Sequence, residues 1–157
     1  MSRHLIYDII LTLKMEILIQ KVDYAKLYVG KNLFSEIENG FLIFVGIEKN
    51  DENKIEKAIE KLMNIKIIGD ENGKFKYSLK EKPLPLLVVS EITLIPNFEE
   101  NKPEFTNSPP KEIAEKIYLE FIEKLKEKNF KVEKGVFGEF MEIENKNLGP
   151  VSFYLKI

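Results

Sequence analysis

The chain has no cysteine and no tryptophan, and it has very little histidine or arginine. Its only histidine is His4 and its only arginine is Arg3, so neither residue type occurs in the body of the chain. The lack of cysteine excludes disulfides and thiolate metal sites. A Ser-His-Asp or Cys-His group, a histidine metal site and an arginine clamp on phosphate are excluded from the body as well. Chemistry there must use hydroxyl groups, carboxylates, lysines, amides and backbone N–H groups, and we expect no metal and no other cofactor.

Neither sign of charge is in large excess, since 24 basic and 26 acidic side chains leave a formal net charge of -2. This balance argues against binding nucleic acid by bulk charge, although a local lysine patch remains able to do so. The chain has no Gly-x-x-x-x-Gly-Lys loop for a nucleotide phosphate. With 157 residues it is long enough to bury one hydrophobic core, so we expect a single domain.

The first residues do not fit a signal peptide or a membrane span. The apolar run at residues 5–13 is short and interrupted by Asp8, and no small-residue cleavage site follows it. We therefore expect a cytoplasmic protein. We interpret residues 1–14 as an extension ahead of a domain at residues 15–157. A start assigned too early, with Met15 the true beginning, is the preferred explanation, and an extra helix or strand is the alternative.

The stretch from residue 86 to residue 94 changes character halfway along. Residues 86–89 are apolar and predict a strand buried on both faces. Hydroxyl and carboxylate groups then follow at Ser90, Glu91 and Thr93. Polar groups carried out of a core on a rigid strand are well placed to form a site. The alternative is a core strand that simply reaches the surface.

The other segments alternate between strand and helix patterns. Apolar periodicity predicts amphipathic helices at residues 51–64 and 109–128, with Asp51 and Ser108 as N-caps. Asn39-Gly40 predicts a hairpin turn, and the loop at residues 97–110 is long enough to cover a site. Strands are expected at residues 16–22, 25–29, 33–37, 41–47, 65–68, 75–79, 130–136, 139–143 and 151–157.

Two short motifs are the most informative features of the sequence. They are Ser90-Glu91-Ile92-Thr93-Leu94 and Asn147-Leu148-Gly149-Pro150-Val151-Ser152. With them the chain resembles the D-aminoacyl-tRNA deacylases, whose usual motifs at these places are Ser-Gln-Phe-Thr-Leu and Asn-x-Gly-Pro-Val-Thr. The resemblance runs in order from Met15 to Ile157. It also includes Gln20 and Lys21, Gly46-Ile47-Glu48-Lys49, Asp70-Glu71-Asn72-Gly73-Lys74, Phe105, Phe137-Gly138 and Met141.

The resemblance implies an α+β fold with an antiparallel β-barrel-like sheet, flanked by two main helices, and a homodimer. It implies hydrolysis of the ester between a D-amino acid and the terminal ribose of tRNA. Glycyl-tRNA is a further candidate substrate, because glycine has no side chain to exclude. In that family the Gly-Pro bond is cis, and the dipeptide enters the partner subunit's pocket. Its carbonyl groups hold the substrate's α-amino group, so that an L side chain would collide while a D side chain points away.

Residue by residue, the resemblance suggests catalytic roles for Ser90, Glu91 and Thr93. It suggests substrate-binding roles for Lys21, Ile92, Phe105, Phe137, Met141, Gly149 and Pro150. A threonine without an adjacent base is a weak nucleophile, so a lysine or Glu91 would have to act as the base. Otherwise, backbone N–H groups near Ile92 and Thr93 bind the oxyanion while the tRNA's own 2′-hydroxyl helps to activate water. The resemblance favours this substrate-assisted scheme.

Several positions depart from the family's usual pattern. Glu91 replaces a glutamine, so an amide that can donate becomes a carboxylate that only accepts when ionised. It is a candidate base or a partner for the substrate's ammonium group, or it marks a changed substrate. Lys21 replaces an arginine that braces the Gly-Pro loop, so a planar fork becomes a point charge. Two milder changes are Ile92 for an aromatic residue and Ser152 for threonine. In the long loop, Lys102-Pro103-Glu104-Phe105 replaces the family's Arg-Pro-Ser-Phe.

Two alternative functions stay open at this point. One is the same fold used as an editing module for an L-aminoacyl-tRNA, as in archaeal threonyl-tRNA synthetases. The other is a non-catalytic dimer that binds tRNA or DNA, in which Glu91 has spoiled the site. The lysines of the helix at residues 111–128 are a weak RNA-facing candidate, because glutamates interleave with them and a solvated face explains them.

Overall fold

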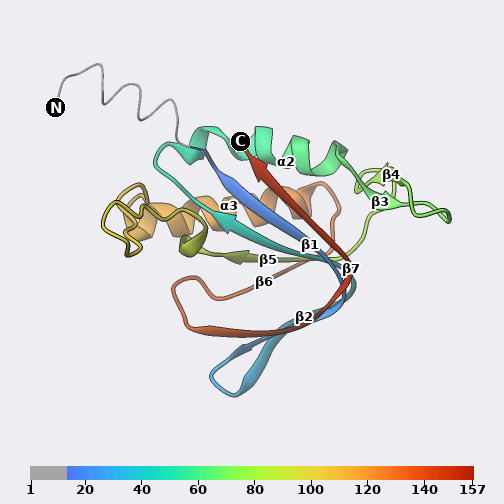
Figure 1. The fold of residues 1–157 in the computed structure, drawn as a ribbon, viewed down its shortest axis with the longest axis horizontal. Coiled ribbons are helices and arrows are strands. Elements are labelled where there is room, and N and C mark those ends of the chain that lie inside the picture. Colours follow the sequence, from blue (N-terminus) through green and yellow to red (C-terminus); the bar gives the residue numbers. More distant parts are fainter. Residues whose placement is uncertain (1–13) are drawn as a thin grey trace.

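A five-stranded sheet with two helices on one of its faces forms the body of the molecule (Figure 1). The structure is a computed structural model that describes residues 14–157. The expected N-terminal extension therefore lies outside the described residues, apart from Lys14. In the described part, no helix is long and apolar enough to cross a membrane.

The sheet is mixed and open, which corrects the expectation of an antiparallel barrel-like sheet. Its strand order is β6-β5-β2-β1-β7, and β1 pairs antiparallel with both β2 and β7. β5 lies parallel to β2 on one side and to β6 on the other. Because β6 and β7 form opposite edges, the strands do not close into a barrel. The bounds are β1 Glu16–Val29, β2 Asn32–Gly46, β5 Leu86–Ser90, β6 Val132–Lys134 and β7 Met141–Lys156.

Long strands replace several of the expected short ones. β1 and β2 are single strands of 14 and 15 residues, so the predicted turn at Asn39-Gly40 is wrong. Asn39 does have a positive φ of 46°, but the chain continues along the sheet. Gly40 is needed for another reason: a Cβ atom there would lie 2.1 Å from the carbonyl oxygen of Pro85. Backbone from the start of β5 therefore approaches β2 too closely for any side chain.

β7 is likewise one strand of 16 residues, where two strands and a loop were expected. Its pairing with β1 is irregular around residues 147–152, where Gln20 pairs with Ser152 and Val22 already pairs with Asn147. The Gly149-Pro150 motif sits in this irregular segment, whose residues are partly or fully exposed. β7 is an edge strand, a position that tolerates a proline because one side of the strand has no ladder partner.

Two hydrophobic cores lie on the two faces of the sheet. One face of β1, β2 and β5 packs against the helices, with residues such as Ile17, Ile43 and Val88 meeting Leu62 and Phe121. The second, smaller core includes Val22, Leu27, Ile37, Leu42, Leu87 and Val89 and packs within the curve of the sheet. Because β5 contributes to both cores, its apolar run is buried on both faces, as its sequence predicted.

The two helices form as expected, but their caps do not. α2 spans Ile55–Asn64 and α3 spans Lys111–Glu127. Asp51 lies in a preceding 3-10 turn, η1 (Asp51–Asn53), where its buried carboxylate accepts the N–H of Glu48 at 2.6 Å and pairs with Lys54 at 2.9 Å. Burial raises the pKa of the Asp51 carboxyl group. Pro110 precedes α3 without a side-chain cap, and the Ser108 hydroxyl contacts the carbonyl of Pro109 instead.

The remaining elements agree with the sequence. β3 (Lys66–Gly69) and β4 (Phe75–Ser78) form the expected hairpin. The connection from residue 97 to residue 110 is a loop with an isolated bridge between Asn97 and Glu104, and the N–H of Lys49 donates to the carbonyl of Asn107 at 2.9 Å. It lies beside the end of β5 and the start of α3 (Figure 1).

Candidate functional site

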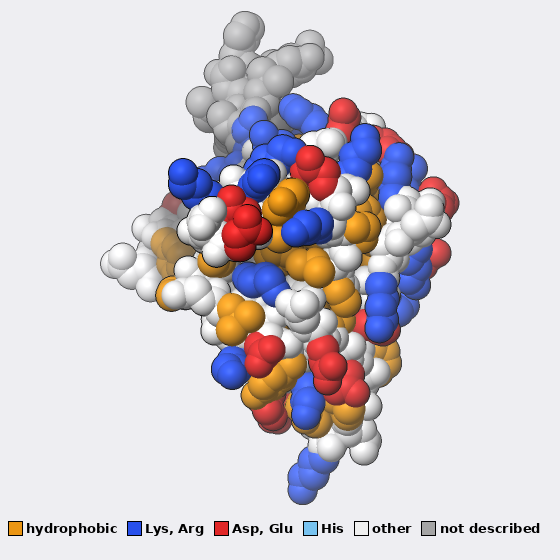
Figure 2. Space-filling model, turned by 90° about the vertical axis from the view of Figure 1, so that its right-hand side faces the viewer, with side chains coloured by type: hydrophobic (Ala, Val, Ile, Leu, Met, Phe, Trp, Pro, Cys, Tyr) orange, Lys and Arg blue, Asp and Glu red, His pale blue; other side chains and the backbone are white. Residues whose placement is uncertain are grey.

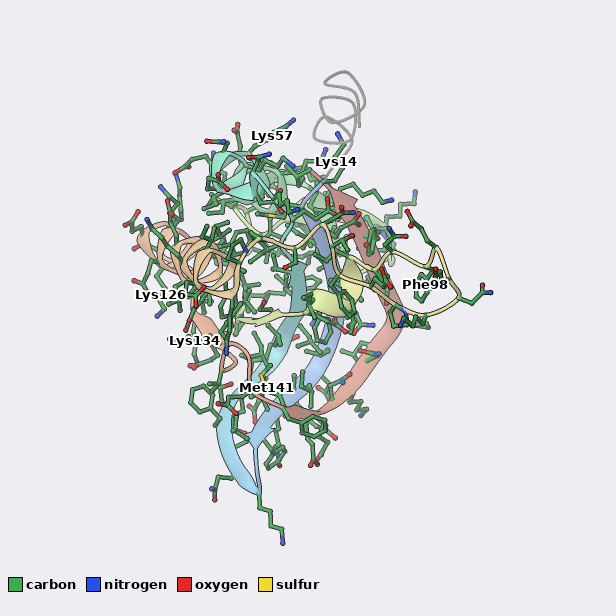
Figure 3. The ribbon with its side chains drawn as sticks, turned by 90° about the vertical axis from the view of Figure 1, so that its left-hand side faces the viewer. Lys14, Lys57, Phe98, Lys126, Lys134 and Met141 are labelled. Carbon is green, nitrogen blue, oxygen red and sulfur yellow. The ribbon has the colours of Figure 1, made fainter. Side chains whose placement is uncertain are left out.

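A cavity of about 610 Å³ lies at the carboxyl end of β5. The end of β5, the long loop, the first turn of α3 and the connection from β6 to β7 surround it. These segments gather on the left-hand side of Figure 1, and Figure 3 views that side directly, with Met141 labelled. The lining residues are Ser90, Ile92, Phe105, Ser108, Pro109, Lys111, Ala114, Phe137, Gly138, Glu139 and Met141.

The motif at the end of β5 supplies the polar groups of the site. Ser90 is half-buried in the cavity wall, and the chain then turns through η2, a 3-10 turn at Ile92–Leu94. The N–H of Glu91 donates to the carbonyl of Val45 at 2.9 Å, which holds the start of this turn to β2. The predicted strand therefore ends at Ser90, and a tight turn presents the remaining motif residues to solvent.

Glu91 and Thr93 contact each other directly. The Thr93 hydroxyl donates to Oε1 of Glu91 at 2.8 Å. Thr93 is exposed and lies outside the cavity lining, while Ile92 between them lines the cavity and is 47% exposed. The structure thus places a carboxylate beside the threonine, the adjacent group that the sequence could only name as a candidate.

Aromatic and thioether side chains form the apolar wall of the cavity. Phe105 comes from the long loop, Phe137 from the connection between β6 and β7, and Met141 from the start of β7. All three are half-buried, so their side chains still border open space. The structure therefore brings together Ser90, Ile92, Phe105, Phe137 and Met141, five of the residues proposed from the sequence, in one wall.

Tyr118 on α3 is a supporting residue that the sequence did not indicate. Its hydroxyl donates to the carbonyl of Val88 on β5 at 2.7 Å and accepts the N–H of Gly135 at 3.1 Å. Its ring centroid lies 6.0 Å from that of Phe137. Burial raises the pKa of the Tyr118 hydroxyl to about 12. One buried hydroxyl thus joins the strand that ends in the site to the loop that carries Phe137.

Replacing Tyr118 by phenylalanine is expected to destabilise the fold, because two buried hydrogen bonds are lost and the Val88 carbonyl and the Gly135 N–H keep only their longer bond to each other, at 3.3 Å. The expected loss is about 1–3 kcal/mol of unfolding free energy, measured by urea denaturation. Tyr28→Phe is the matched control, since no hydrogen bond of its hydroxyl occurs among the described residues. Equal stability of Tyr118→Phe and Tyr28→Phe would show that the two buried bonds contribute nothing.

Other lining residues were also missed by the sequence. Lys111 lies beside Gly138, where a Cβ atom would be 3.1 Å from the lysine Nζ. Ala114 follows one helical turn after Lys111, on the side of α3 that borders the cavity. No local pattern distinguishes these two from other residues of an amphipathic helix, and only the packing of the loop against α3 makes them part of the site.

Gly149, Pro150 and Lys21 lie apart from this cavity within one chain. Gly149 and Pro150 are exposed on β7, and the peptide bond between them is cis, as the resemblance implied. Lys21 lies on β1 between Gln20 and Val22, opposite the irregular segment. Its ammonium donates to Oδ1 of Asn39 at 2.7 Å and lies 5.7 Å from the Phe41 ring centroid. Partial burial lowers the pKa of Lys21, with Asp23 acting in the opposite direction.

Residues 14–157 contain no group of three or more histidine, cysteine or carboxylate side chains that could hold a metal ion.

Comparison with known proteins gives a consistent result. The family model for D-Tyr-tRNA(Tyr) deacylase matches residues 18–156 of this chain. The chain belongs to the D-Tyr-tRNA(Tyr) deacylase family. The matched range contains the β5 motif, the Gly-Pro motif and every residue that lines the cavity.

Relatives within the deacylase family cover most of the chain. The D-aminoacyl-tRNA deacylase of Thermodesulfovibrio yellowstonii is 41% identical over 140 residues, which are 88% of this chain and 96% of the relative. The D-aminoacyl-tRNA deacylase of Dictyoglomus turgidum is 42% identical over 143 residues, 90% of this chain and 92% of the relative.

Two solved structures share the fold of this chain. The c-Myc DNA Unwinding Element Binding Protein superposes with a TM-score of 0.84 at 33% identity, covering 91% of this chain and 99% of that one. A probable eukaryotic D-amino acid tRNA deacylase has a TM-score of 0.83 at 15% identity, covering 92% of this chain and 100% of that one, and at that identity it supports the fold alone.

Proposed function

We propose that this protein hydrolyses the ester bond of D-aminoacyl-tRNA, releasing the D-amino acid and free tRNA. The observation that carries the proposal is the cavity at the end of β5, which gathers Ser90, Ile92, Phe105, Phe137 and Met141 from separate segments of the chain. Two relatives named D-aminoacyl-tRNA deacylase, each more than 40% identical, support the same substrate.

The first turn of η2 suits the stabilisation of an oxyanion. Within the described residues, the N–H groups of Ile92 and Thr93 form no hydrogen bond, whereas the following N–H of Leu94 donates to Glu91. Two free N–H groups beside the cavity mouth match the donors that an ester hydrolase needs for its tetrahedral intermediate. In the reaction the oxygen of water bonds to the ester carbonyl carbon, the bond from that carbon to the ribose oxygen breaks, and a proton passes to the ribose oxygen.

Glu91 can act in two ways in this scheme. As a carboxylate that accepts from the Thr93 hydroxyl at 2.8 Å, it can accept a proton from water or from that hydroxyl. Alternatively, its negative charge near the cavity mouth attracts the ammonium group of the aminoacyl ester. The 2′-hydroxyl of the tRNA supplies the further assistance that the body of the chain, which lacks histidine, does not provide.

We propose further that the enzyme acts as a homodimer in which Gly149-Pro150 enters the partner's cavity. The dipeptide does not line the cavity of its own chain, yet it is exposed on an edge strand. A second copy related by a two-fold axis would bring both motifs together twice, since a two-fold interface is self-complementary. In this arrangement the Gly149 and Pro150 carbonyls hold the α-amino group, and an L side chain meets the dipeptide.

Replacing Thr93 by alanine is expected to lower kcat by about tenfold or less, because the hydroxyl assists the reaction without being the nucleophile. Single-turnover hydrolysis of D-tyrosyl-tRNA measures the effect. Thr106→Ala, the same substitution at an exposed threonine that does not line the cavity, is the matched control. A loss of a million-fold, comparable with deletion of a triad serine, would mean that Thr93 forms a covalent intermediate instead.

Release of D-tyrosine from D-tyrosyl-tRNA by the purified protein tests the proposed function. We expect multiple turnovers without added metal or cofactor, and hydrolysis that continues in excess EDTA. Absence of release above the spontaneous rate of the ester would contradict the proposal.

One observation favours a second candidate function, a nucleic-acid-binding protein without hydrolytic activity. A structural neighbour at 33% identity is named as a DNA unwinding element binding protein. Binding of uncharged tRNA or of duplex DNA, measured together with the absence of turnover on D-tyrosyl-tRNA, would identify this function.

A further inference from the structure

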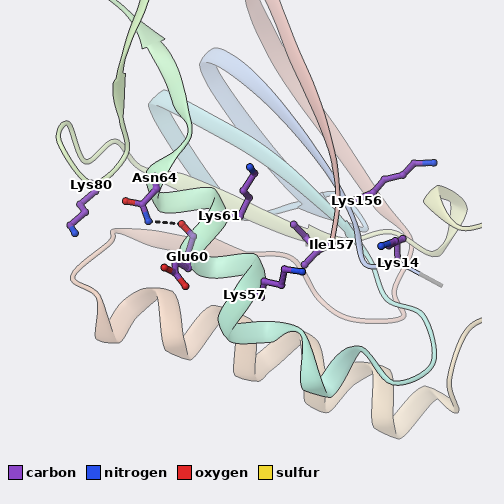
Figure 4. Close-up of a pocket in the computed structure, with 8 residues that line it drawn as sticks. All are labelled: Lys14, Lys57, Glu60, Lys61, Asn64, Lys80, Lys156 and Ile157. Carbon is purple, nitrogen blue, oxygen red and sulfur yellow. Dashed lines mark hydrogen bonds between the residues drawn. The ribbon is translucent and has the colours of Figure 1, made fainter. Parts of the chain in front are cut away.

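A second hollow, of about 670 Å³, lies away from the proposed catalytic cavity and is rich in lysine (Figure 4). We call it the lysine hollow. It is lined by the solvent face of α2, by the residue that follows the β3–β4 hairpin, by the start of β1 and by the end of β7. The lining residues are Lys14, Lys57, Glu60, Lys61, Asn64, Lys80, Lys156 and Ile157.

The lysines of this hollow come together through helix geometry and strand ends. Lys57 and Lys61 are four residues apart on α2, so they lie one above the other on the face opposite the buried residues Ile55 and Ile59. Lys14 and Lys156 lie side by side because the ends of β1 and β7 are paired, with Met15 and Ile157 exchanging two backbone hydrogen bonds of 3.0 and 2.9 Å.

These positive charges are mostly uncompensated. Among the described residues, the only ion pair that a lysine of the hollow forms joins Lys156 to Glu16, at 3.9 Å. Glu60 is the only acidic side chain in the lining. The side chains of Lys14, Lys57, Lys61 and Lys80 therefore face solvent without a carboxylate partner in the described part of the chain, and like charges that gather in this way favour an anionic partner.

Lysines at some other places on the surface are paired with carboxylates. Examples are Lys66 with Glu81 at 2.7 Å, Lys126 with Glu123 at 3.3 Å, and Lys124 with Glu56. Figure 2 shows one face on which lysine and carboxylate side chains are interspersed. In a chain with a net charge of -2, the lysine hollow is a local excess of positive charge.

We propose that the lysine hollow binds backbone phosphates of the tRNA substrate, away from the aminoacyl end. The inference rests on the proposed function and adds a second contact region to it. Lysines without acidic partners suit phosphodiester groups, which contribute affinity and position but no sequence information. A hollow of this size, with ammonium groups from four segments, fits a stretch of backbone better than one small anion.

The positions of the two regions are compatible with one extended ligand. Figure 3 shows Lys14 and Lys57 at the upper end of the molecule and Met141 of the catalytic cavity well below them. Figure 1 agrees, since α2 and the paired strand ends lie at the top while β7 begins lower down. An RNA whose aminoacyl end occupies the catalytic cavity therefore has its body available for the lysine hollow.

The test compares two variants on two substrates. Lys57→Gln/Lys61→Gln removes two charges from the solvent face of α2, and Lys31→Gln/Lys131→Gln removes two exposed, unpaired lysines elsewhere, so both variants have the same net charge. The substrates are D-tyrosyl-tRNA and the D-tyrosyl ester of a short oligonucleotide with the same 3′ end. Thermal melting confirms that both variants fold.

For Lys57→Gln/Lys61→Gln we expect KM on D-tyrosyl-tRNA to rise on the order of tenfold with kcat unchanged. The slope of log KM against log salt should fall by about one for each lysine removed. Hydrolysis of the short ester should not change, and the control variant should match the unmodified protein on both substrates.

Three results would overturn the inference: an unchanged KM on tRNA, an equal loss on both substrates, or an equal loss in the control variant. Failure of the unmodified protein to hydrolyse either ester is a different outcome, because it refutes the proposed function itself. In that case, binding of uncharged tRNA by the same two variants tests the role of the lysine hollow separately. Weaker binding by Lys57→Gln/Lys61→Gln alone supports phosphate binding at the hollow, and equal binding by both variants overturns it.

Discussion

Gly149→Ala is expected to lower kcat/KM on D-tyrosyl-tRNA about 100-fold while the protein stays folded. Gly149 has a φ of +110°, and a Cβ atom there would lie 2.6 Å from Cγ2 and 2.8 Å from the backbone nitrogen of Val151. The segment must therefore shift, and a misplacement of about 1 Å in a positioning group is enough for a loss of this size. The cost to stability is about 1–3 kcal/mol, because the strain is confined to an exposed part of an edge strand.

Steady-state hydrolysis and thermal melting together measure this prediction. Gly30→Ala is the matched control, because Gly30 also has a positive φ, +63°, but a Cβ atom there meets nothing within 4 Å. It should lose some stability and keep its activity. If Gly149→Ala were as active as Gly30→Ala, the Gly-Pro segment would have no part in catalysis.

Ala114→Phe is expected to lower kcat/KM at least 100-fold by filling the catalytic cavity. Ala114 is 6% exposed and lines the cavity from the first turn of α3, so a phenyl ring at this position occupies room that the aminoacyl-adenosine end requires. The loss should fall mainly on KM, since the groups at the end of β5 are not altered.

Leu119→Phe on the same helix is the control for this change. Leu119 is 37% exposed, so an added ring there meets solvent and should leave hydrolysis unaffected. Full activity of a folded Ala114→Phe protein would show that the substrate binds outside this cavity.

The two inactive variants together test the proposed dimer. If Gly149-Pro150 acts in the partner's cavity, a mixed dimer of Gly149→Ala and Ala114→Phe chains has one site with an intact cavity and an intact dipeptide. After random exchange of subunits, activity should recover to about one quarter of that of the unmodified protein. No recovery, with exchange confirmed by mass spectrometry, would place the dipeptide and the cavity it serves on the same chain.

Much of the cavity could be predicted from the sequence because its residues lie at the ends of elements with strong patterns. The apolar run at residues 86–89 predicted a buried strand, and the polar residues after it mark its exit from the core. Phe105 and Met141 have no such local pattern. Only their order along the chain, compared with a known family, indicated a role in the site.

Long-range packing explains most of the differences. Asn39-Gly40 has the composition of a hairpin turn, but the close approach of Pro85 keeps β2 extended and requires the glycine. Tyr118 has the spacing of a core residue on α3, and its function depends on Val88 and Gly135, which are 30 and 17 residues away. Hydrogen bonds between such distant residues leave no periodic signal in the sequence.

The expected barrel-like sheet was implied by the family resemblance and not by the pattern of residues. Alternating apolar patterns predict strands but not which strands form the edges, and here β6 and β7 are the two unclosed edges of a mixed sheet. For Lys21, the family's arginine suggested a brace for the Gly-Pro segment. The lysine is opposite that segment on β1, but in the described chain its ammonium donates hydrogen bonds to the carbonyl of Val22 and the side chain of Asn39.

Hydrolysis of matched D- and L-tyrosyl-tRNA, measured side by side for the unmodified protein and for Glu91→Gln, tests the central claim most directly. We expect the unmodified protein to release D-tyrosine rapidly and to leave the L ester at its spontaneous rate. We expect Glu91→Gln, which restores the amide usual in the family, to keep this preference. Equal hydrolysis of both esters, or release of L-tyrosine alone, would contradict the proposal that this protein removes D-amino acids from tRNA.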